Sequence, residues 1–245
     1  MKVIAPELAF ARTVRAFTTT RVGGASCGKF TGLNLATHVG DLVASVSENR
    51  RLVENTQNLP ATPRWLNQVH GTRIVNAHEI RRSDIPNADG SYTDKAGVVC
   101  AIMSADCLPI VIADSFGQEV ATLHAGWKGL LEGVVPAAID RFRASAAHLS
   151  AWIGPGISVD AYAVKRNFRD WFVSKNEAYE PAFRQEFGVW HADLYLLAQT
   201  QLRDLGVATV SRYQGCTYGE PTQFFSYRRD GVTGRMATLA WIEEP

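Results

Sequence analysis

The sequence has no excess of charge of either sign, few cysteines and no long hydrophobic run. Its 245 residues include 25 lysines and arginines against 24 aspartates and glutamates, so the net charge is +1. This balance provides no overall field that would attract nucleic acid or an anionic membrane. Four cysteines are too sparse for a disulfide scaffold in a chain of this length. The most apolar window, Val98–Ala113, is broken by Asp106 and is shorter than the ~20 residues of a membrane span.

Several other familiar features are also missing. The chain has no internal repeat, no long linker and no phosphate loop of the GxGxxG or GxxxxGK[ST] kind. Residues 1–17 contain no basic segment followed by an apolar one, so we expect no signal peptide and a cytoplasmic protein. Hydrophobic residues at 46% and charged residues at 20% are an ordinary globular composition. We therefore expect one globular domain over residues 1–245.

Short β-branched and aromatic runs predict a fold rich in β-sheet. Eight runs bounded by Gly, Pro, Asp or Asn are expected to be strands: Val14–Thr19, Trp65–Val69, Val98–Met103, Leu108–Ala113, Val120–His124, Ala151–Ile153, Val207–Ser211 and Met236–Trp241. The expected helices do not alternate strictly with these strands. This order favours an α+β fold, with mixed β-sheets flanked by helices, over a doubly wound fold.

Four segments are expected to be helices because of their apolar periodicity or their capping residues. Ser45 and Glu48 have the spacing of a capping box, which predicts a helix start at Ser45. Pro136 lies inside the second segment, so that helix should have a kink or a late start. The four helices are expected to begin near Ser45, Lys128, Lys165 and Asp193.

Potential metal ligands stand where predicted strands meet loops. His70 lies in NQVHG, Cys107 in SADCLP and His124 in LHAGW, and each is followed within two residues by Gly or Pro. Two imidazoles and a thiolate form a ligand set for zinc or copper, with one tetrahedral position left open for water. The spacing alone favours a structural histidine with an inert core cysteine, and it also allows a Cys107 nucleophile with His124 as its base.

Longer blocks of the sequence resemble a known family. The blocks are TTTRVGG (18–24), GLNLATHVGD (32–41), NQVHG (67–71), ADGSYTD (88–94), MSADCLPI (103–110), HAGWKGL (124–130), WIGPGIS (152–158), CTY (216–218) and FFSYRRDGVTGRMA (224–237). In this order they resemble the YfiH-type family, also called the polyphenol-oxidase or laccase-domain family and peptidoglycan editing factor. The resemblance implies a single α+β domain with two mixed sheets, related to the fold of cytotoxic-necrotizing-factor deamidase toxins.

The same resemblance implies a cofactor and an activity. It implies a zinc site formed by His70, Cys107 and His124, with copper as the metal in an older naming. It also implies phosphorolysis of adenosine, inosine, guanosine and methylthioadenosine, with inorganic phosphate as co-substrate, and hydrolytic deamination of adenosine. Three alternatives remain: an amidase that removes L-serine from UDP-MurNAc-L-serine, a metal-free Cys–His hydrolase, and a copper-dependent polyphenol oxidase.

Two aspartates are candidate catalytic groups beside the three ligands. A carboxylate near a metal can orient a ligand histidine or act as a general acid or base. Asp106 interrupts an apolar run, where a polar group is costly to bury. Asp89 precedes Gly90, so it fits a turn as well as a functional role.

Other candidates would bind the substrate. Arg21 beside a Val-Gly-Gly turn is the first candidate for phosphate, because guanidinium forks suit phosphate oxygens, and Arg228 is a weaker one. Tyr227 could stack on a purine, although an aromatic run at strand spacing also fits a core. Asn34 and His38 of the GLNLATHVGD block are candidates for the same pocket. The expected partners are small molecules, either purine nucleosides or a UDP-MurNAc-amino acid, and neither nucleic acid nor a membrane.

Overall fold

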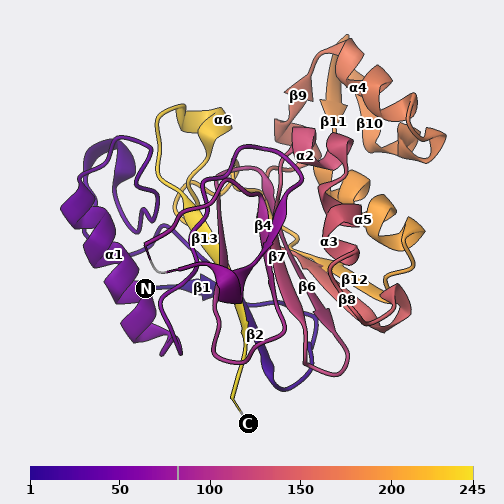
Figure 1. Cartoon of the computed structure of the whole chain (residues 1–245). Helices are drawn as coiled ribbons and strands as arrows, with labels where there is room; N and C mark the ends of the chain where they lie inside the picture. Colours follow the sequence, from indigo (N-terminus) through magenta and orange to yellow (C-terminus); the bar gives the residue numbers. More distant parts are fainter. Residues whose placement is uncertain (82, 245) are drawn as a thin grey trace.

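Two β-sheets lie face to face between layers of helices. Figure 1 shows the computed structural model, which describes residues 1–81 and 83–244. Helix α1 (Val43–Thr56) covers the outer side of one sheet. Helices α2 (Trp127–Glu132), α3 (Val134–Ile139) and α5 (Leu194–Asp204) cover the outer side of the other. The expected α+β fold with mixed sheets flanked by helices is therefore confirmed.

The smaller of the two facing sheets is antiparallel and contains both ends of the chain. Its strand order is β1 (Val3–Ile4), β2 (Val14–Thr19), β13 (Met236–Ile242) and β5 (Cys100–Ser104). The last strand of the chain thus lies in the interior of the sheet, with β2 on one side and β5 on the other.

The larger sheet has six strands and mixed directions. Its order is β12 (Thr209–Arg212), β8 (Leu149–Ile153), β6 (Leu108–Asp114), β7 (Val120–Ala125), β4 (Gly90–Thr93) and β3 (Ile74–Asn76). The pairs β12–β8 and β3–β4 are parallel and the others antiparallel. Along β6, Ile110 and Ile112 pack under the helices, while Val111 and Ala113 pack against the smaller sheet. Burial on both faces explains why this strand is an almost continuous apolar run.

A third, small sheet projects beside the two large ones, at the upper right of Figure 1. Its order is β10 (Phe183–Glu186), β11 (Val189–Ala192) and β9 (Ala163–Val164), and α4 (Arg166–Val173) packs with it. The short helix α6 (Tyr227–Asp230) lies at the top of Figure 1, between α1 and the third sheet. Short 3-10 turns occupy Gly28–Phe30, Ala77–Glu79, Ala146–His148, Val159–Ala161 and Glu177–Ala182.

Two of the helix predictions are confirmed by details of the backbone. The predicted second helix is broken at Gly133, whose φ of 101° is left-handed, and Pro136 is the third residue of the new helix α3. Proline is tolerated in the first turn of a helix because its missing N–H would have no partner there. Of the two predicted outcomes, a kink or a late start, the structure has the late start. At α5 the Asp193 side chain accepts a hydrogen bond from the N–H of Leu196 at 2.9 Å, as expected of an N-cap.

The predicted start of the first helix was wrong. Helix α1 begins at Val43, so Ser45 lies within its first turn and caps nothing. The N–H of Leu42 donates instead to the Asp41 carboxylate at 2.8 Å, so an aspartate two residues before the helix holds its entry. A capping-box spacing cannot reveal this competing residue.

The strand predicted at Trp65–Val69 was also wrong. This segment has only isolated bridges, of Arg64 with Cys100 and of Asn67 with Asn87. The amide side chain of Gln68 replaces a strand ladder: it donates to the carbonyl of Met103 and accepts from its N–H, both at 2.7 Å. The segment is thereby fixed to β5 without being a strand.

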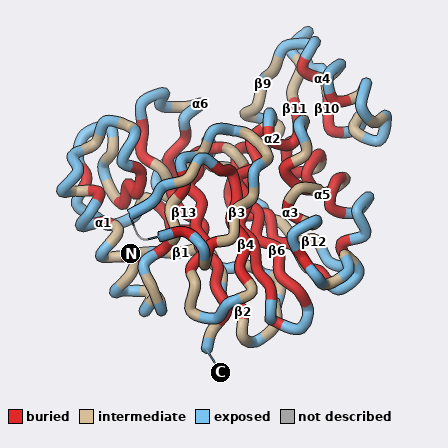
Figure 2. Tube along the Cα trace, in the orientation of Figure 1, coloured by how far each residue is buried: buried red, intermediate tan, exposed pale blue. Residues whose placement is uncertain are grey.

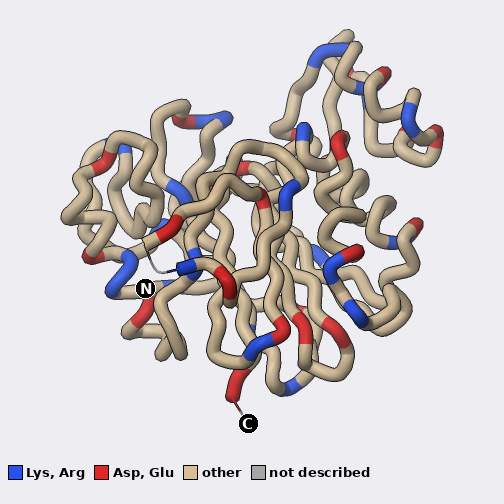
Figure 3. Tube along the Cα trace, viewed as in Figure 1, with Lys and Arg blue, Asp and Glu red and all other residues tan. Residues whose placement is uncertain are grey.

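Burial and charge follow the same layers. Figure 2 shows the strands of the two facing sheets buried along most of their length and the turns exposed. Figure 3 shows basic and acidic residues interspersed over the molecule in this view, in keeping with the near-zero net charge. Within residues 1–81 and 83–244, no helix combines the length and apolar character needed to traverse a lipid bilayer.

Candidate metal centre and its cavity

Cys107 stands where the chain passes from one large sheet to the other. Strand β5 ends at Ser104 in the smaller sheet, and β6 begins at Leu108 in the larger sheet. The three residues between them make the crossing, and both flanking strands are buried along their whole length. A thiol at this position is held by rigid elements on both sides, as a reactive or metal-binding group requires.

The turn before Cys107 is fixed by Asp106. Its φ of 89° lies in the left-handed region, which is uncommon for a residue with a side chain. Its carboxylate accepts hydrogen bonds from Thr217 Oγ1 at 2.6 Å, Ser226 Oγ at 3.0 Å and the N–H of Arg228 at 2.7 Å. The structure therefore places this carboxylate against the C-terminal loops, where it joins them to the crossing.

Asp89 fixes both histidines of the site. It is fully buried, directly before β4. Its carboxylate accepts from the N–H groups of Val69 at 3.1 Å, His70 at 2.9 Å and Gly71 at 2.7 Å, and from His124 Nδ1 at 2.9 Å. His70 has a φ of 58°, in the left-handed region. At this turn the three consecutive backbone N–H groups all point to the Asp89 carboxylate.

The side chains of His70, Cys107 and His124 converge. Their potential ligand atoms all lie within 4.8 Å of one another, and Cys107 Sγ is 4.0 Å from His70 Nε2. Because His124 Nδ1 donates to Asp89, its Nε2 is the nitrogen left free for a ligand. Ligand atoms around tetrahedral zinc stand about 3.5 Å apart. The donor set therefore fits one such ion after small side-chain movements.

The charges of the site favour a thiolate. Burial raises the pKa of Cys107, but the neighbouring His124 and His70 lower it by more, so the net shift is downward. Burial lowers the pKa of His124, but Cys107 and Asp89 raise it by more. Thiolate is the form in which cysteine binds metals and acts as a nucleophile.

A cavity of about 450 Å³ opens beside these three side chains. Of the residues that the sequence singled out for the substrate, His38 and Tyr227 line it. Sequence reasoning missed Gln68, Ser104 and Arg235, although all three stand inside the quoted blocks. The whole lining is His38, Gln68, His70, Met103, Ser104, Ala105, Cys107, His124, Tyr227 and Arg235.

Arg235 supplies the cation of this cavity. Its Nη1 donates to the carbonyls of Thr233 at 2.9 Å and Gly234 at 3.0 Å. Its backbone N–H donates to Oδ1 of the buried Asn34 at 2.9 Å. Asn34 is not part of the cavity wall and instead positions Arg235.

The two arginines proposed from the sequence lie elsewhere. Arg21 donates to two backbone carbonyls at 3.1 and 3.2 Å, and Arg228 donates to the carbonyl of Ala163 at 2.9 Å. Neither belongs to the cavity lining, whereas Arg235 does.

Gly126 leaves room for the ligands, which gives a first prediction. A Cβ atom at this position would stand 3.0 Å from Cys107 Sγ and 3.1 Å from His70 Cδ2. We expect Gly126→Ala to displace both side chains and to weaken Co²⁺ affinity about 10- to 100-fold, measured by the thiolate-to-cobalt absorption band. Gly219→Ala is the control, because its Cβ would make ordinary contacts at 3.7 and 3.9 Å. Equal affinity in Gly126→Ala and wild type would contradict the ligand assignment.

Comparison with known proteins supports the fold and shows the family. A family model described as multi-copper polyphenol oxidoreductase laccase matches residues 15–243, so the chain belongs to that family. An Escherichia coli relative named purine nucleoside phosphorylase YfiH is 39% identical over 241 residues, which cover 98% of this chain and 99% of the relative. The resemblance to the YfiH-type family is therefore confirmed.

Two solved structures support the fold. A crystal structure of a Neisseria meningitidis protein has a TM-score of 0.95 and 40% identity, and the match covers 100% of both chains. The Bacillus licheniformis hypothetical protein YfiH has a TM-score of 0.88 and 30% identity, with 94% and 93% of the two chains covered.

Proposed function

We propose that the chain is a purine nucleoside phosphorylase that works in the cavity beside Cys107. The observation that carries the proposal is the meeting of a His–Cys–His group and the guanidinium of Arg235 at one cavity of about 450 Å³. The printed name of the relative at 39% identity supports the substrate class. We extend the proposal to hydrolytic deamination of adenosine in the same cavity.

Phosphorolysis requires groups that bind phosphate and that assist the transfer of a proton. A phosphate oxygen forms a bond to the ribose C1′, the bond from C1′ to the purine nitrogen breaks, and the purine takes up a proton. Arg235 would bind the phosphate, since guanidinium and phosphate form strong charged hydrogen bonds. His38 beside it would donate or accept as a neutral ring, because partial burial and the charges of Arg235 and Arg50 lower its pKa.

The nucleoside would meet two further side chains. The Ser104 hydroxyl is buried at the cavity and has no hydrogen-bond partner among the described residues. It would bond to a ribose hydroxyl, because buried polar groups are normally paired. Tyr227 is 61% exposed, and its ring offers a flat surface for the purine.

The metal in this proposal is zinc, bound by His70, Cys107 and His124. When bound, zinc would supply a Lewis acid that polarises oxygen and activates water near neutral pH. Asp89 would keep His124 in the orientation and tautomer that a ligand needs. Within residues 1–81 and 83–244 this is the one such ligand group, whereas oxidases that reduce O₂ by four electrons use several coppers. For that reason we favour nucleoside chemistry over phenol oxidation.

Product analysis tests the proposal. Zinc-loaded protein is incubated with adenosine, with and without phosphate, and the products are separated by chromatography. We expect adenine and ribose 1-phosphate only with phosphate, and inosine without it. Arg235→Met should raise the KM for phosphate about tenfold or more, whereas the exposed Arg51→Met should not change it. If neither product forms, the proposal fails, and UDP-MurNAc-L-serine becomes the next substrate to test.

A second candidate function rests on the same residues. Asp89, His124 and Cys107 have the order of an orienting carboxylate, a base and a nucleophile, so a metal-free hydrolase is the main rival. A chelator would abolish the activity of the zinc enzyme and spare the thiol hydrolase. An alkylating reagent would abolish both, so the chelator result distinguishes them.

A further inference from the structure

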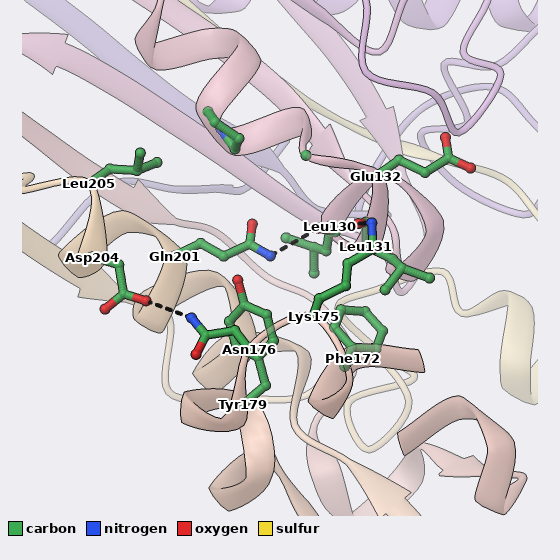
Figure 4. Close-up of a pocket in the computed structure, with 12 residues that line it drawn as sticks. Leu130, Leu131, Glu132, Phe172, Lys175, Asn176, Tyr179, Gln201, Asp204 and Leu205 are labelled. Atoms are coloured by element: carbon green, nitrogen blue, oxygen red, sulfur yellow. Dashed lines mark hydrogen bonds between the residues drawn. The ribbon is translucent and has the colours of Figure 1, made fainter. Parts of the chain in front are cut away.

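A second cavity lies at the far end of helix α2 from the metal centre. It has a volume of about 320 Å³ and is enclosed by the end of α2, the start of α3, the end of α4 and helix α5 (Figure 4). None of its lining residues lines the cavity at Cys107. The proposed phosphorylase activity makes no use of this space, which is large enough for a small ligand.

The floor of this cavity contains an unpaired hydrogen-bond acceptor. Gln201 is only 7% exposed. Its Nε2 donates to the carbonyl of Leu130 at 2.9 Å, while its Oε1 has no hydrogen-bond partner among the described residues. In Figure 4 this oxygen points away from Leu130 into the space between α5 and α3. A buried acceptor of this kind is stabilised by any ligand that brings an N–H or O–H donor to it.

The wall around Gln201 is apolar in part, and Asn176 and Tyr179 add an amide and a phenol to it. Leu130 and Phe172 are fully buried, and Leu131, Pro136 and Leu205 complete the surface. Such walls suit a flat hydrophobic ring, since burial of its surface is favourable and needs no further polar partners.

The mouth of the cavity disfavours anions. Glu132 and Asp204 place two carboxylates there, and Asp204 lies one turn along α5 from Gln201. The single ammonium, of Lys175, already donates to the carbonyl of Leu131 at 2.7 Å. An acceptor at the floor and a net negative mouth together select a donor that is neutral or positively charged.

From these observations we propose that this cavity binds a small aromatic molecule that carries an N–H donor and no negative charge. The N–H would donate to Gln201 Oε1, and the ring would lie against Leu131, Pro136 and Leu205. Bound ligand would contact α2 near its end, and the N-terminus of that helix follows Gly126 at the metal centre. The ligand site is thus separate from the catalytic cavity yet joined to it by one short helix.

Indole and benzothiophene form a matched pair of probes, because both are flat bicyclic rings and only indole has an N–H. Each is titrated into the full-length protein, and the backbone amide signals are followed by NMR. We expect indole to shift the signals of Leu131, Phe172 and Gln201, and to bind about tenfold more tightly than benzothiophene. Indole-3-acetate should bind more weakly than indole.

A variant tests the contact itself. Gln201→Leu removes the acceptor and should make indole and benzothiophene bind equally, whereas the exposed Gln185→Leu should leave the preference for indole unchanged. If Gln201→Leu does not fold, the comparison of the two probes on wild type still decides. Equal affinity of the probes for wild type, no binding at millimolar concentration, or shifts confined to residues near Cys107 would each overturn the proposal.

Discussion

Cys107→Ala is expected to lower kcat/KM for phosphorolysis at least ~10³-fold and to abolish tight zinc binding. The thiolate is the one negatively charged ligand of the three, and the two imidazoles that remain hold zinc weakly. If zinc acts as proposed, loss of the ion would remove several kcal/mol of transition-state stabilisation, which corresponds to this factor in rate. The side chain is partly exposed and small, so the melting temperature of the metal-free protein should change little.

The measurement is a steady-state assay together with zinc analysis of the purified variants. Cys27→Ala is the control, since Cys27 is an exposed free cysteine outside the cavity. It should keep both zinc and activity. If Cys107→Ala turned over substrate within tenfold of the wild-type rate, Cys107 would have no essential role in the reaction.

Asp89→Asn should impair both the fold and the site. An asparagine cannot accept from all four donors, because its NH₂ would face one or more N–H groups. Breaking such a buried charged network costs about 3–5 kcal/mol of the free energy of unfolding. A freed His124 ring should also reduce zinc affinity about 10- to 100-fold.

Urea unfolding and zinc titration measure the two effects of Asp89→Asn. Asp94→Asn is the matched control, because Asp94 follows the same strand β4 but pairs with Lys95 and Arg143 at the surface. We expect it to lose at most about 1 kcal/mol. A similar loss in the two variants would mean that the hydrogen bonds of Asp89 do not set the site.

The contribution of Asp89 should also depend on pH. Burial raises its pKa, but the hydrogen bond from His124 and those from the Gly71 and Val69 amides lower it by more. Its folded-state pKa thus lies below the unfolded value of about 3.9. A group with a lowered pKa adds stability above the unfolded value and loses it as the pH falls through the folded value. The difference between wild type and Asp89→Asn should therefore be full at pH 7 and shrink below about pH 4.

The parts of the fold that the sequence predicts well are those buried on both sides. Strands β6, β7 and β13 are apolar along nearly all their length, because each has a packed layer on either face. Strand β10 contains Arg184, Gln185 and Glu186, and its pairing depends on the neighbouring strand β11 rather than on its own composition. The sequence of such a strand has no alternation of apolar and polar residues that would predict it.

The candidate site shows the same division. The meeting of His70, Cys107 and His124 was expected from the family resemblance, because their spacing alone left other interpretations open. Arg235 was not, because its place depends on Asn34, which binds its backbone from 201 positions away in the chain. Arg21 looked better suited in sequence, yet it does not line the cavity.

The position of β13 has a consequence for how the protein is made. This strand is synthesised long after β2 and β5, yet it lies between them. In the growing chain, the facing edges of β2 and β5 therefore lack their partner, and open strand edges invite pairing with other chains. The smaller sheet closes only after β13 has been synthesised, so chains cut short before Met236 should depend on chaperones and be degraded rather than accumulate as active fragments.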